Sequence, residues 1–239
     1  MGNIQKVVGG ALLVKKYKDH ILVIADTHTP FELYHYLDFC TQIGNRVKCG
    51  TVVHIGDLVD NHAINYHEHD PNGKSPEDEM RKADEHLKRW FKAFPSLFLC
   101  RGNHDRLVDR KCRTSGLPDR VFKPFRDIWR LPKGWVDDFS FEIDGVRYTH
   151  GTGLSGENAH IKAASQNRQS TVIGHTHSTG AINYLVSEKD RIFGMNVGCG
   201  IDRKTYAFEY GRDFTKKPVI GCGVVTDNGK FAQFFPMAL

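Results

Sequence analysis

The sequence lacks most of the features that would set it apart from ordinary globular proteins. Its six cysteines include no Cys-x-x-Cys pair, so a disulfide framework is not indicated. No apolar run approaches the roughly 20 residues that span a bilayer. Residues 1–18 contain no apolar stretch followed by a cleavage site of the secretory type. We therefore expect reduced, mostly buried thiols, no membrane partner and a cytoplasmic location.

The composition is that of a protein with one sizeable core. The chain has 239 residues, of which 40% are hydrophobic and 26% charged, and it has no internal repeat, low-complexity tract or linker. We expect a single domain over residues 1–239. The net charge is only +5, whereas the thirteen histidines are an excess that needs a functional explanation.

Short apolar runs alternate with longer amphipathic stretches, which predicts an α/β fold with mixed sheets. The predicted strands are 21–25, 51–55, 97–100, 139–148, 171–174, 192–197 and 219–225, and the predicted helices are 31–43, 76–94, 119–131 and 157–166. The run Asp227-Asn228-Gly229 is a strong turn signal and predicts a hairpin late in the chain.

The residues that follow five of these strands are the main functional signal. In α/β sheets, ligands bind beyond the carboxyl ends of the strands. Each of these five ends supplies Asp, His or Asn, which are metal-ligating residue types. The five segments are Asp26-Thr27-His28, Gly56-Asp57-Leu58-Val59-Asp60, Arg101-Gly102-Asn103-His104-Asp105, Thr149-His150-Gly151 and Gly174-His175-Thr176-His177. The sequence therefore predicts a metal centre at the strand ends.

The spacing within these segments suits shared coordination. Residues i and i+2 of an extended segment point the same way, so Asp26 and His28 can bind one cation, and His175 and His177 can bind one or two. The carboxylate of Asp57 has two oxygens and can bridge two ions. Mixed nitrogen and oxygen ligands favour Mn²⁺, with Fe, Zn²⁺ or Ni²⁺ as alternatives. Two ions roughly 3.5–4 Å apart are a common device for displacement at phosphorus.

Taken in order, the motifs D-x-H, G-D-x-x-D, G-N-H-D, H and G-H-x-H resemble the calcineurin-like metallophosphoesterase superfamily from Asp26 to His177. The resemblance implies two mixed β-sheets packed as a sandwich and flanked by helices, in four layers, with two divalent metals at one end. It also implies that a metal-activated hydroxide attacks phosphorus, that His104 protonates the leaving oxygen, and that Asp105 orients the His104 ring. By the same resemblance, one metal is held by Asp26, His28 and His177, and the other is held by Asn103, His150 and His175. Asp57 would bind both metals.

Two departures from the protein-phosphatase pattern bear on the substrate. Relatives that act on phosphoserine and phosphothreonine usually have Arg after G-D-x-x-D and Glu at the end of the Asn-His motif, whereas this chain has Asn61 and Asp105. We therefore expect a phosphodiesterase of the nuclease-like branch. The alternatives are a phosphomonoesterase, acting on a small ester or a phosphoprotein, and a non-catalytic metal-binding scaffold. A scaffold has no need of His104, which argues against it.

Charge and aromatic residues favour a nucleotide or single-stranded nucleic acid as substrate. Residues 101–133 contain ten Lys or Arg and four Asp, and residues 203–217 alternate basic and aromatic side chains. The alternatives are a solvated helical face for the first segment and a half-buried strand for the second. Arg101, His160 and Arg168 are the expected substrate contacts. The sequence does not fix the oligomeric state.

Overall fold

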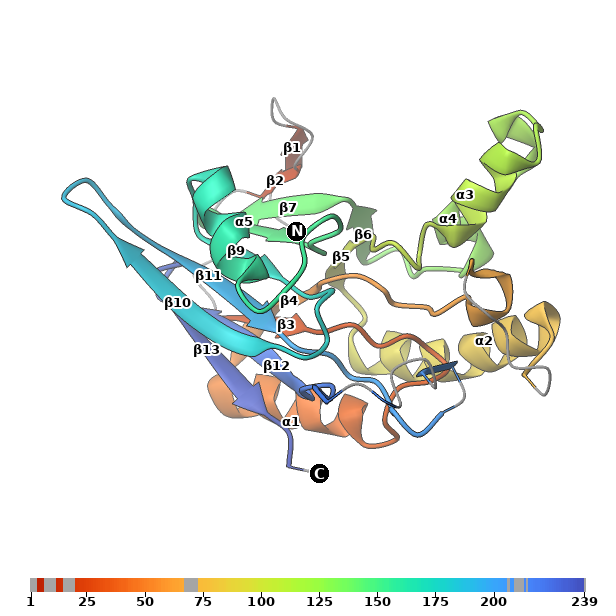
Figure 1. Ribbon diagram of the computed structural model, residues 1–239, viewed down its shortest axis with the longest axis horizontal. Helices are drawn as coiled ribbons and strands as arrows, with labels where there is room; N and C mark the ends of the chain where they lie inside the picture. Colours follow the sequence, from red (N-terminus) through yellow and green to blue (C-terminus); the bar gives the residue numbers. More distant parts are fainter. Residues whose placement is uncertain are drawn as a thin grey trace.

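The structure is a computed structural model that describes residues 4–6, 12–14, 20–66, 73–205, 207–208, 213 and 215–238. Two β-sheets and the helices that flank them account for most of this chain (Figure 1). Part of the basic and aromatic stretch 203–217 lies outside the described residues, so the prediction made for that stretch stays a prediction.

The first sheet has six strands in the order β13-β12-β3-β4-β5-β6. Its centre is built from nearly continuous apolar runs that are buried on both faces, as is typical of parallel sheets covered on each side. Four strands are parallel, and β12 and β13 add an antiparallel hairpin beyond β3. The strands are β3 (His20–Ile24), β4 (Cys49–His54), β5 (Leu97–Cys100), β6 (Trp135–Asp138), β12 (Gly221–Thr226) and β13 (Phe231–Pro236).

The second sheet has seven strands in the order β1-β2-β7-β8-β9-β11-β10, and it mixes parallel and antiparallel pairs. It faces the first sheet, with contacts between β5 and β7, β11 and β12, and β10 and β13. The strands are β1 (Ile4–Lys6), β2 (Leu12–Val14), β7 (Ser140–Ile143), β8 (Val146–Thr149), β9 (Thr171–Ile173), β10 (Gly180–Val186) and β11 (Arg191–Val197).

Helices cover the outer faces of both sheets. In Figure 1, α1 (Tyr36–Val47) and α2 (Pro76–Ala93) lie along the six-stranded sheet, and α5 (Ala159–Asn167) packs on β9 and β11. The start of α2 is well specified, because the Ser75 side chain accepts a hydrogen bond from the Asp78 amide and Pro76 occupies the first turn. The predicted sandwich of two mixed sheets flanked by helices is confirmed.

The remaining helical segments are short. They are η1 (His62–Ile64), α3 (Leu107–Thr114), η2 (Asp119–Val121) and α4 (Phe125–Ile128). Figure 1 shows α3 projecting from the end of the sandwich opposite the β10–β11 hairpin.

Two predicted elements are wrong. The strand predicted over 139–148 is two strands, β7 and β8, because Asp144 and Gly145 adopt positive φ angles of 51° and 75° and turn the chain. The helix predicted over 119–131 is reduced to η2 and α4. Pro124 stands between them and cannot donate a backbone hydrogen bond. The turn at Asp227-Asn228-Gly229 is confirmed, since it joins β12 and β13 with three positive φ angles.

All six cysteines are unpaired, and five of them are buried, as the sequence predicts. Within the described ranges, no helix is both long enough and apolar enough to span a membrane.

Candidate metal centre

The five predicted strand ends meet at one edge of the sandwich. Asp26 and His28 follow β3, Asp57 follows β4, and the Asn103-His104 turn follows β5 in the first sheet. His150 follows β8, and His175 and His177 follow β9 in the second sheet. Side chains from both sheets therefore converge on the space between the sheet edges.

The potential ligand atoms form overlapping groups in which all members lie within 4.8 Å of one another. One group contains Asp26, His28 and His177, and another contains Asp57, His150 and His175. The Asp57 Oδ2 atom lies between them, 3.6 Å from His28 Nε2 and 3.1 Å from His150 Nε2. The third group joins His28, Asp57 and His104.

Asn103 belongs to the same cluster, because its Oδ1 atom lies 3.0 Å from His150 Nε2. The structure thus brings together all seven residues that the sequence predicts as ligands. Their assignment to two ions stays a prediction.

Hydrogen bonds on the far side of two rings leave the inward-facing nitrogens free to ligate a cation. His28 Nδ1 donates to the Asp60 carboxylate at 2.5 Å, so its Nε2 atom carries the lone pair. His150 Nδ1 donates to the Ile55 carbonyl at 3.2 Å, so its Nε2 atom is the one that faces the cluster. A ligating histidine usually has such a partner on its other nitrogen, and the partner fixes the tautomer.

Two further observations fit a cation. The Nε2 atoms of His28 and His177 face each other at 3.1 Å, which is the arrangement of two ligands around one ion. The Oδ1 atom of Asp26 is buried and has no hydrogen-bond partner among the described residues. Such an orphaned carboxylate oxygen is costly unless a cation binds it. The mixed nitrogen and oxygen donors match divalent ions such as Mn²⁺ or Zn²⁺.

The electrostatics keep most of these groups in their ligating forms. Burial raises the pKa of the Asp57 carboxyl, but His150 and His104 outweigh burial and hold that pKa well below its usual range. Burial and the nearby His104 lower the pKa of His28, so its ring is neutral. For His150, burial lowers the pKa, but Asp57 and Asp26 outweigh it and raise it to about 9. A cation binding at His150 therefore displaces a proton.

The backbone at the site is strained in a way that aims the side chains. His28, Asp57 and His175 all have positive φ angles, of 49°, 47° and 66°. L-residues rarely adopt this region, and strain of this kind concentrates at functional sites. Two glycines allow the close approach that the site requires, since a Cβ at Gly102 would overlap Asp57 Oδ1 and one at Gly174 would overlap Asp26 Oδ1.

Asp60 is the residue that sequence reasoning missed. It is buried, its carboxylate holds His28, and its carbonyl accepts the Nδ1–H of His104 at 2.7 Å. It is the last residue of the G-D-x-x-D motif, so the signal was present although no role was derived from it. The expectation that Asp105 orients the His104 ring differs from the structure. The Asp105 carboxylate instead accepts the amides of Gly102 at 2.8 Å and Val59 at 3.2 Å.

The three expected substrate contacts lie in different surroundings. Arg101 adjoins the Asn103 turn, and its side chain is 22% exposed. His160 is buried and its Nε2 atom lies 2.7 Å from Asn183 Oδ1, which leaves it no surface for a substrate. Arg168 is exposed at the end of α5, before the amino end of β9, whereas the metal ligands follow the carboxyl end of that strand. The structure does not bring His160 or Arg168 into the cluster.

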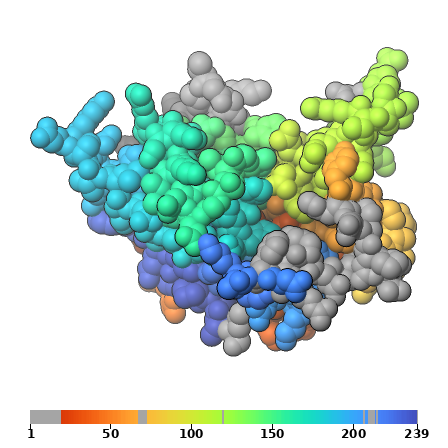
Figure 2. Space-filling view, in the orientation of Figure 1, coloured from red at the N-terminus to blue at the C-terminus, as the bar shows by residue number. Residues whose placement is uncertain are grey.

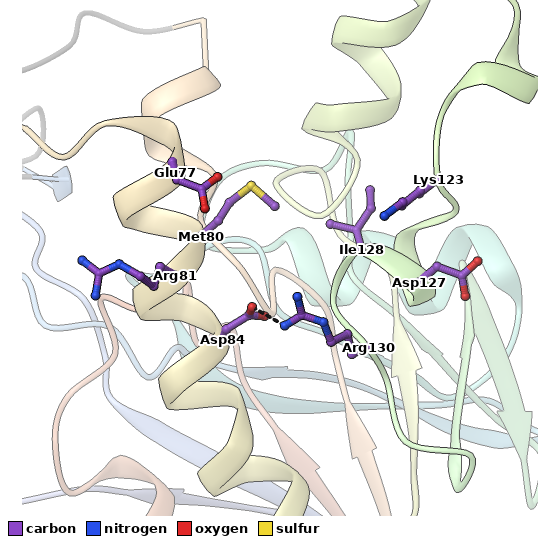
Figure 3. Close-up of a pocket in the computed structure, with 8 residues that line it drawn as sticks. All are labelled: Glu77, Met80, Arg81, Asp84, Lys123, Asp127, Ile128 and Arg130. Carbon is purple, nitrogen blue, oxygen red and sulfur yellow. Dashed lines mark hydrogen bonds and ion pairs between the residues drawn. The ribbon is translucent and has the colours of Figure 1, made fainter.

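A cavity between α2 and α4 is lined by none of the site residues (Figure 3). Its charges are balanced, with Asp84 and Arg130 forming an ion pair at 2.7 Å across it. The lining residues are Glu77, Met80, Arg81, Asp84, Lys123, Asp127, Ile128 and Arg130. It is separate from the metal centre.

Comparison with known families decides what kind of centre this is. The model of the calcineurin-like phosphoesterase family matches residues 20–191, which include every predicted metal ligand. The chain belongs to this family. Calcineurin-like phosphoesterases are metal-dependent hydrolases of phosphoesters, and the Asp and His clusters described above are able to bind the metal.

Solved structures also resemble this calcineurin-like phosphoesterase. An archaeal phosphodiesterase shares 15% identity at a TM-score of 0.48, covering 91% of this chain and 99% of that chain. A metallophosphoesterase from Sphaerobacter thermophilus shares 16% identity at a TM-score of 0.48, and the match covers 92% of this chain and 88% of that chain. Vacuolar protein sorting 29 from Cryptosporidium parvum shares 11% identity at a TM-score of 0.45, and the match covers 94% of this chain and 100% of that chain. A search of curated proteins gives no match.

Proposed function

We propose that this phosphoesterase is a dinuclear phosphodiesterase that hydrolyses nucleotides or single-stranded nucleic acid, with Mn²⁺ as the expected ion. The observation that supports it best is the position of Asp57 Oδ2 between two sets of donors. Asp26, His28 and His177 would hold one ion, Asn103, His150 and His175 the other, and Asp57 would contribute to both. When bound, such ions polarise phosphoryl oxygens and lower the pKa of water.

The protein's own contribution begins with orientation. Asp60 and the Ile55 carbonyl hold the rings of His28 and His150 with their Nε2 atoms inward. Rigid placement of ligands in advance reduces the reorganisation needed during the reaction. In this proposal Asp105 is a positioning residue, because it binds the backbone amides of Gly102 and Val59 and so shapes the turns that carry Asn103 and Asp57.

His104 is suited to donate a proton to the leaving oxygen. Its Nδ1–H is committed to the Asp60 carbonyl, and its backbone amide donates to Asp57 Oδ1 at 2.8 Å. Burial lowers the pKa of His104, but Asp57 and Asp60 outweigh burial and raise it to about 10, so the ring is protonated and its Nε2–H is the proton it can donate to a substrate. The side chain is 21% exposed, whereas that of His28 is 1% exposed, so His104 lies at the open rim of the cluster. A general acid must lie where the substrate enters.

The preference for a diester rests on the charges around the site. Among the residues that the structure describes, no Lys or Arg nitrogen lies within 4.0 Å of the carboxylates of Asp26, Asp57 or Asp60, which pair only with histidines. Asn61 is committed as well, since its Nδ2 atom donates to the His104 carbonyl at 3.0 Å. A monoester dianion carries one more negative charge than a diester and would benefit from a further cation here.

The first test is hydrolysis of bis-p-nitrophenyl phosphate and p-nitrophenyl phosphate side by side with Mn²⁺. We expect faster cleavage of the diester. The variant Asp57→Asn should abolish turnover and lower the content of both metals, because it removes the shared carboxylate. Faster monoester cleavage would favour the phosphomonoesterase instead. Bound metal without activity on either ester would favour the scaffold.

We also propose that the chain works as a single domain in the cytoplasm. The support is the continuous hydrophobic core that joins both sheets, together with the six unpaired thiols. Limited proteolysis that released a stable fragment would contradict the single domain.

A further inference from the structure

An exposed aromatic ring with two cations over it lies beside the metal centre. Phe139 follows β6 and is 45% exposed. The guanidinium of Arg101 lies 4.4 Å from its ring centroid and that of Arg106 lies 5.0 Å from it. These two arginines flank the turn that carries Asn103 and His104. The ring and its cations are therefore tied directly to the segment that supplies a metal ligand and the proposed acid.

A second ring repeats this arrangement farther along α3. Tyr66 is 50% exposed, with the Arg110 guanidinium 4.7 Å and the Lys111 Nζ atom 4.0 Å from its ring centroid. Tyr66 follows η1, which contacts α3. His62 of η1 has its Nδ1 atom 3.7 Å from Asp60 Oδ2, so the segment that leads to Tyr66 adjoins the metal centre.

Most of the charge of this surface is available to a ligand. Of the cations in residues 101–133, Arg101 lies 3.7 Å from Asp137, Arg126 lies 3.2 Å from the same carboxylate, and Arg130 is paired with Asp84 at 2.7 Å. By contrast, no carboxylate of the described chain lies within 4.0 Å of Arg106, Arg110 or Lys111. The basic excess seen in the sequence is thus partly neutralised near α4 and left open on α3. Figure 2 shows α3, in yellow-green, standing out from the body of the molecule.

We propose that these residues form a binding track for a single-stranded nucleic acid, which leads the strand to the metal centre. The proposal rests on the proposed function and names its substrate class. We call this surface the α3 track, and its members are Tyr66, Arg101, Arg106, Arg110, Lys111 and Phe139. Aromatic rings stack unpaired bases of any sequence, and neighbouring cations bind the phosphates. Two ring and cation units in succession give a strand two places to stack.

The chemistry favours a single strand over other polyanions. A duplex has its bases stacked internally, so it would use the cations but not the exposed rings. An acidic protein segment offers charge without a regular series of flat rings. RNA and DNA share the chemistry that the α3 track recognises, and both belong in the test.

The test measures binding of fluorescent 12-nucleotide single strands of DNA and RNA by anisotropy, with EDTA present so that no hydrolysis occurs. Phe139→Ala and Tyr66→Ala should each weaken binding about 10-fold, the usual scale for losing one stacked base. The double variant Arg110→Ala/Lys111→Ala should also lower the salt dependence, by about 0.7 in the slope of log K against log salt for each lost phosphate contact. Thermal melting shows that each variant is folded.

The chain offers a matched control at its opposite end. Phe231 is 47% exposed with the Arg191 guanidinium 4.9 Å from its ring centroid, the same chemistry as at Phe139. Arg191 begins β11, away from α3 in Figure 1. We expect Phe231→Ala and Arg191→Ala to bind the strands as tightly as the original protein.

Three outcomes would overturn the α3 track. They are unchanged binding by folded Phe139→Ala and Tyr66→Ala variants, an equal loss in the Phe231→Ala control, and equally tight binding of a duplex or of an acidic peptide of the same charge. Hydrolysis of bis-p-nitrophenyl phosphate is measured separately. Strand binding that depends on the track in a protein without diesterase activity would support the track and contradict the proposed function. Diesterase activity without strand binding would support the phosphodiesterase and contradict the α3 track.

Discussion

Asp60 forms hydrogen bonds with two histidines, the proposed ligand His28 and the proposed acid His104. Its carboxylate fixes the tautomer of His28, and its carbonyl orients the ring of His104 by accepting the Nδ1–H. Burial raises the pKa of Asp60, but hydrogen bonds from His104 and His28 outweigh burial and hold that pKa below its usual value. The Asp60 carboxylate therefore stays charged. In our proposal it holds His28 and does not itself bind an ion.

For this reason Asp60→Asn should weaken binding of Mn²⁺ by 10- to 100-fold, the usual scale for losing the partner of a ligating histidine. Calorimetric titration with Mn²⁺ measures it. Asp84→Asn is the control, since Asp84 pairs with Arg130 in the cavity that is separate from the metal centre. The role assigned to Asp60 is wrong if its variant binds Mn²⁺ as the original protein does, or if Asp84→Asn weakens binding just as much.

His104 lies close enough to His28 and Asp57 to belong to a ligand group, so its role needs a test of its own. We expect His104→Ala to retain both metals and to lower the rate of diester hydrolysis by roughly 10²–10⁴, the scale of a lost general acid. Metal analysis of the purified variant accompanies the rate measurement. Loss of one metal would make His104 a ligand rather than the acid.

At the scale of elements, α2 positions the loop beyond β4 through one buried carboxylate. Glu79 accepts the amides of His62 at 2.7 Å and Ala63 at 2.8 Å, which fixes η1. Burial raises the pKa of Glu79 to about 7, and the charge of Asp60 adds to the effect, although the amides oppose it. The folded protein therefore binds this proton more tightly than the unfolded chain, in which the pKa is about 4.5.

It follows that Glu79 makes the free energy of unfolding fall as the pH rises from about 4.5 to about 7. Glu79→Gln removes this dependence. As the pH rises between those values, the free energy of unfolding of the variant should increase relative to that of the original protein by up to about 3 kcal/mol. Urea unfolding at pH 4.5, 6 and 8 measures the difference. A constant difference at all three values would show that the proton on Glu79 does not affect folding.

Prediction from sequence succeeded for elements whose signal is local. The strands before Asp26, Asp57 and Asn103 are buried apolar runs, so their ends and the ligands that follow them were visible. The edge strands β10 and β13 were not predicted, although their residues are mostly apolar, because they are half exposed at the sheet edges and lack the buried run that marks the central strands. The role of Asp60 depends on rings that are 32 and 44 positions away in sequence, which spacing alone does not reveal.

At the scale of the whole molecule, the proposed metal ligands join both sheets, so metal binding should stabilise the entire fold. A ligand at 100 times its dissociation constant that binds only the folded state adds about 2.7 kcal/mol per site, and hence about 5 kcal/mol for two sites. We expect Mn²⁺ to raise the melting temperature of the metal-free protein by about 10–20 °C. Differential scanning calorimetry with and without EDTA measures this, with Mg²⁺ as a comparison. An unchanged melting temperature would contradict a centre that spans the two sheets.

The spread of ligands along the chain also governs when the centre can exist during synthesis. Asp26 is made early and His177 late, and β3, which leads to Asp26, needs β12 as its neighbour on one side. In our proposal a growing chain therefore cannot complete the centre until His177 has been made and β12 has paired with β3. Metal then binds the complete centre only after both sheets have formed.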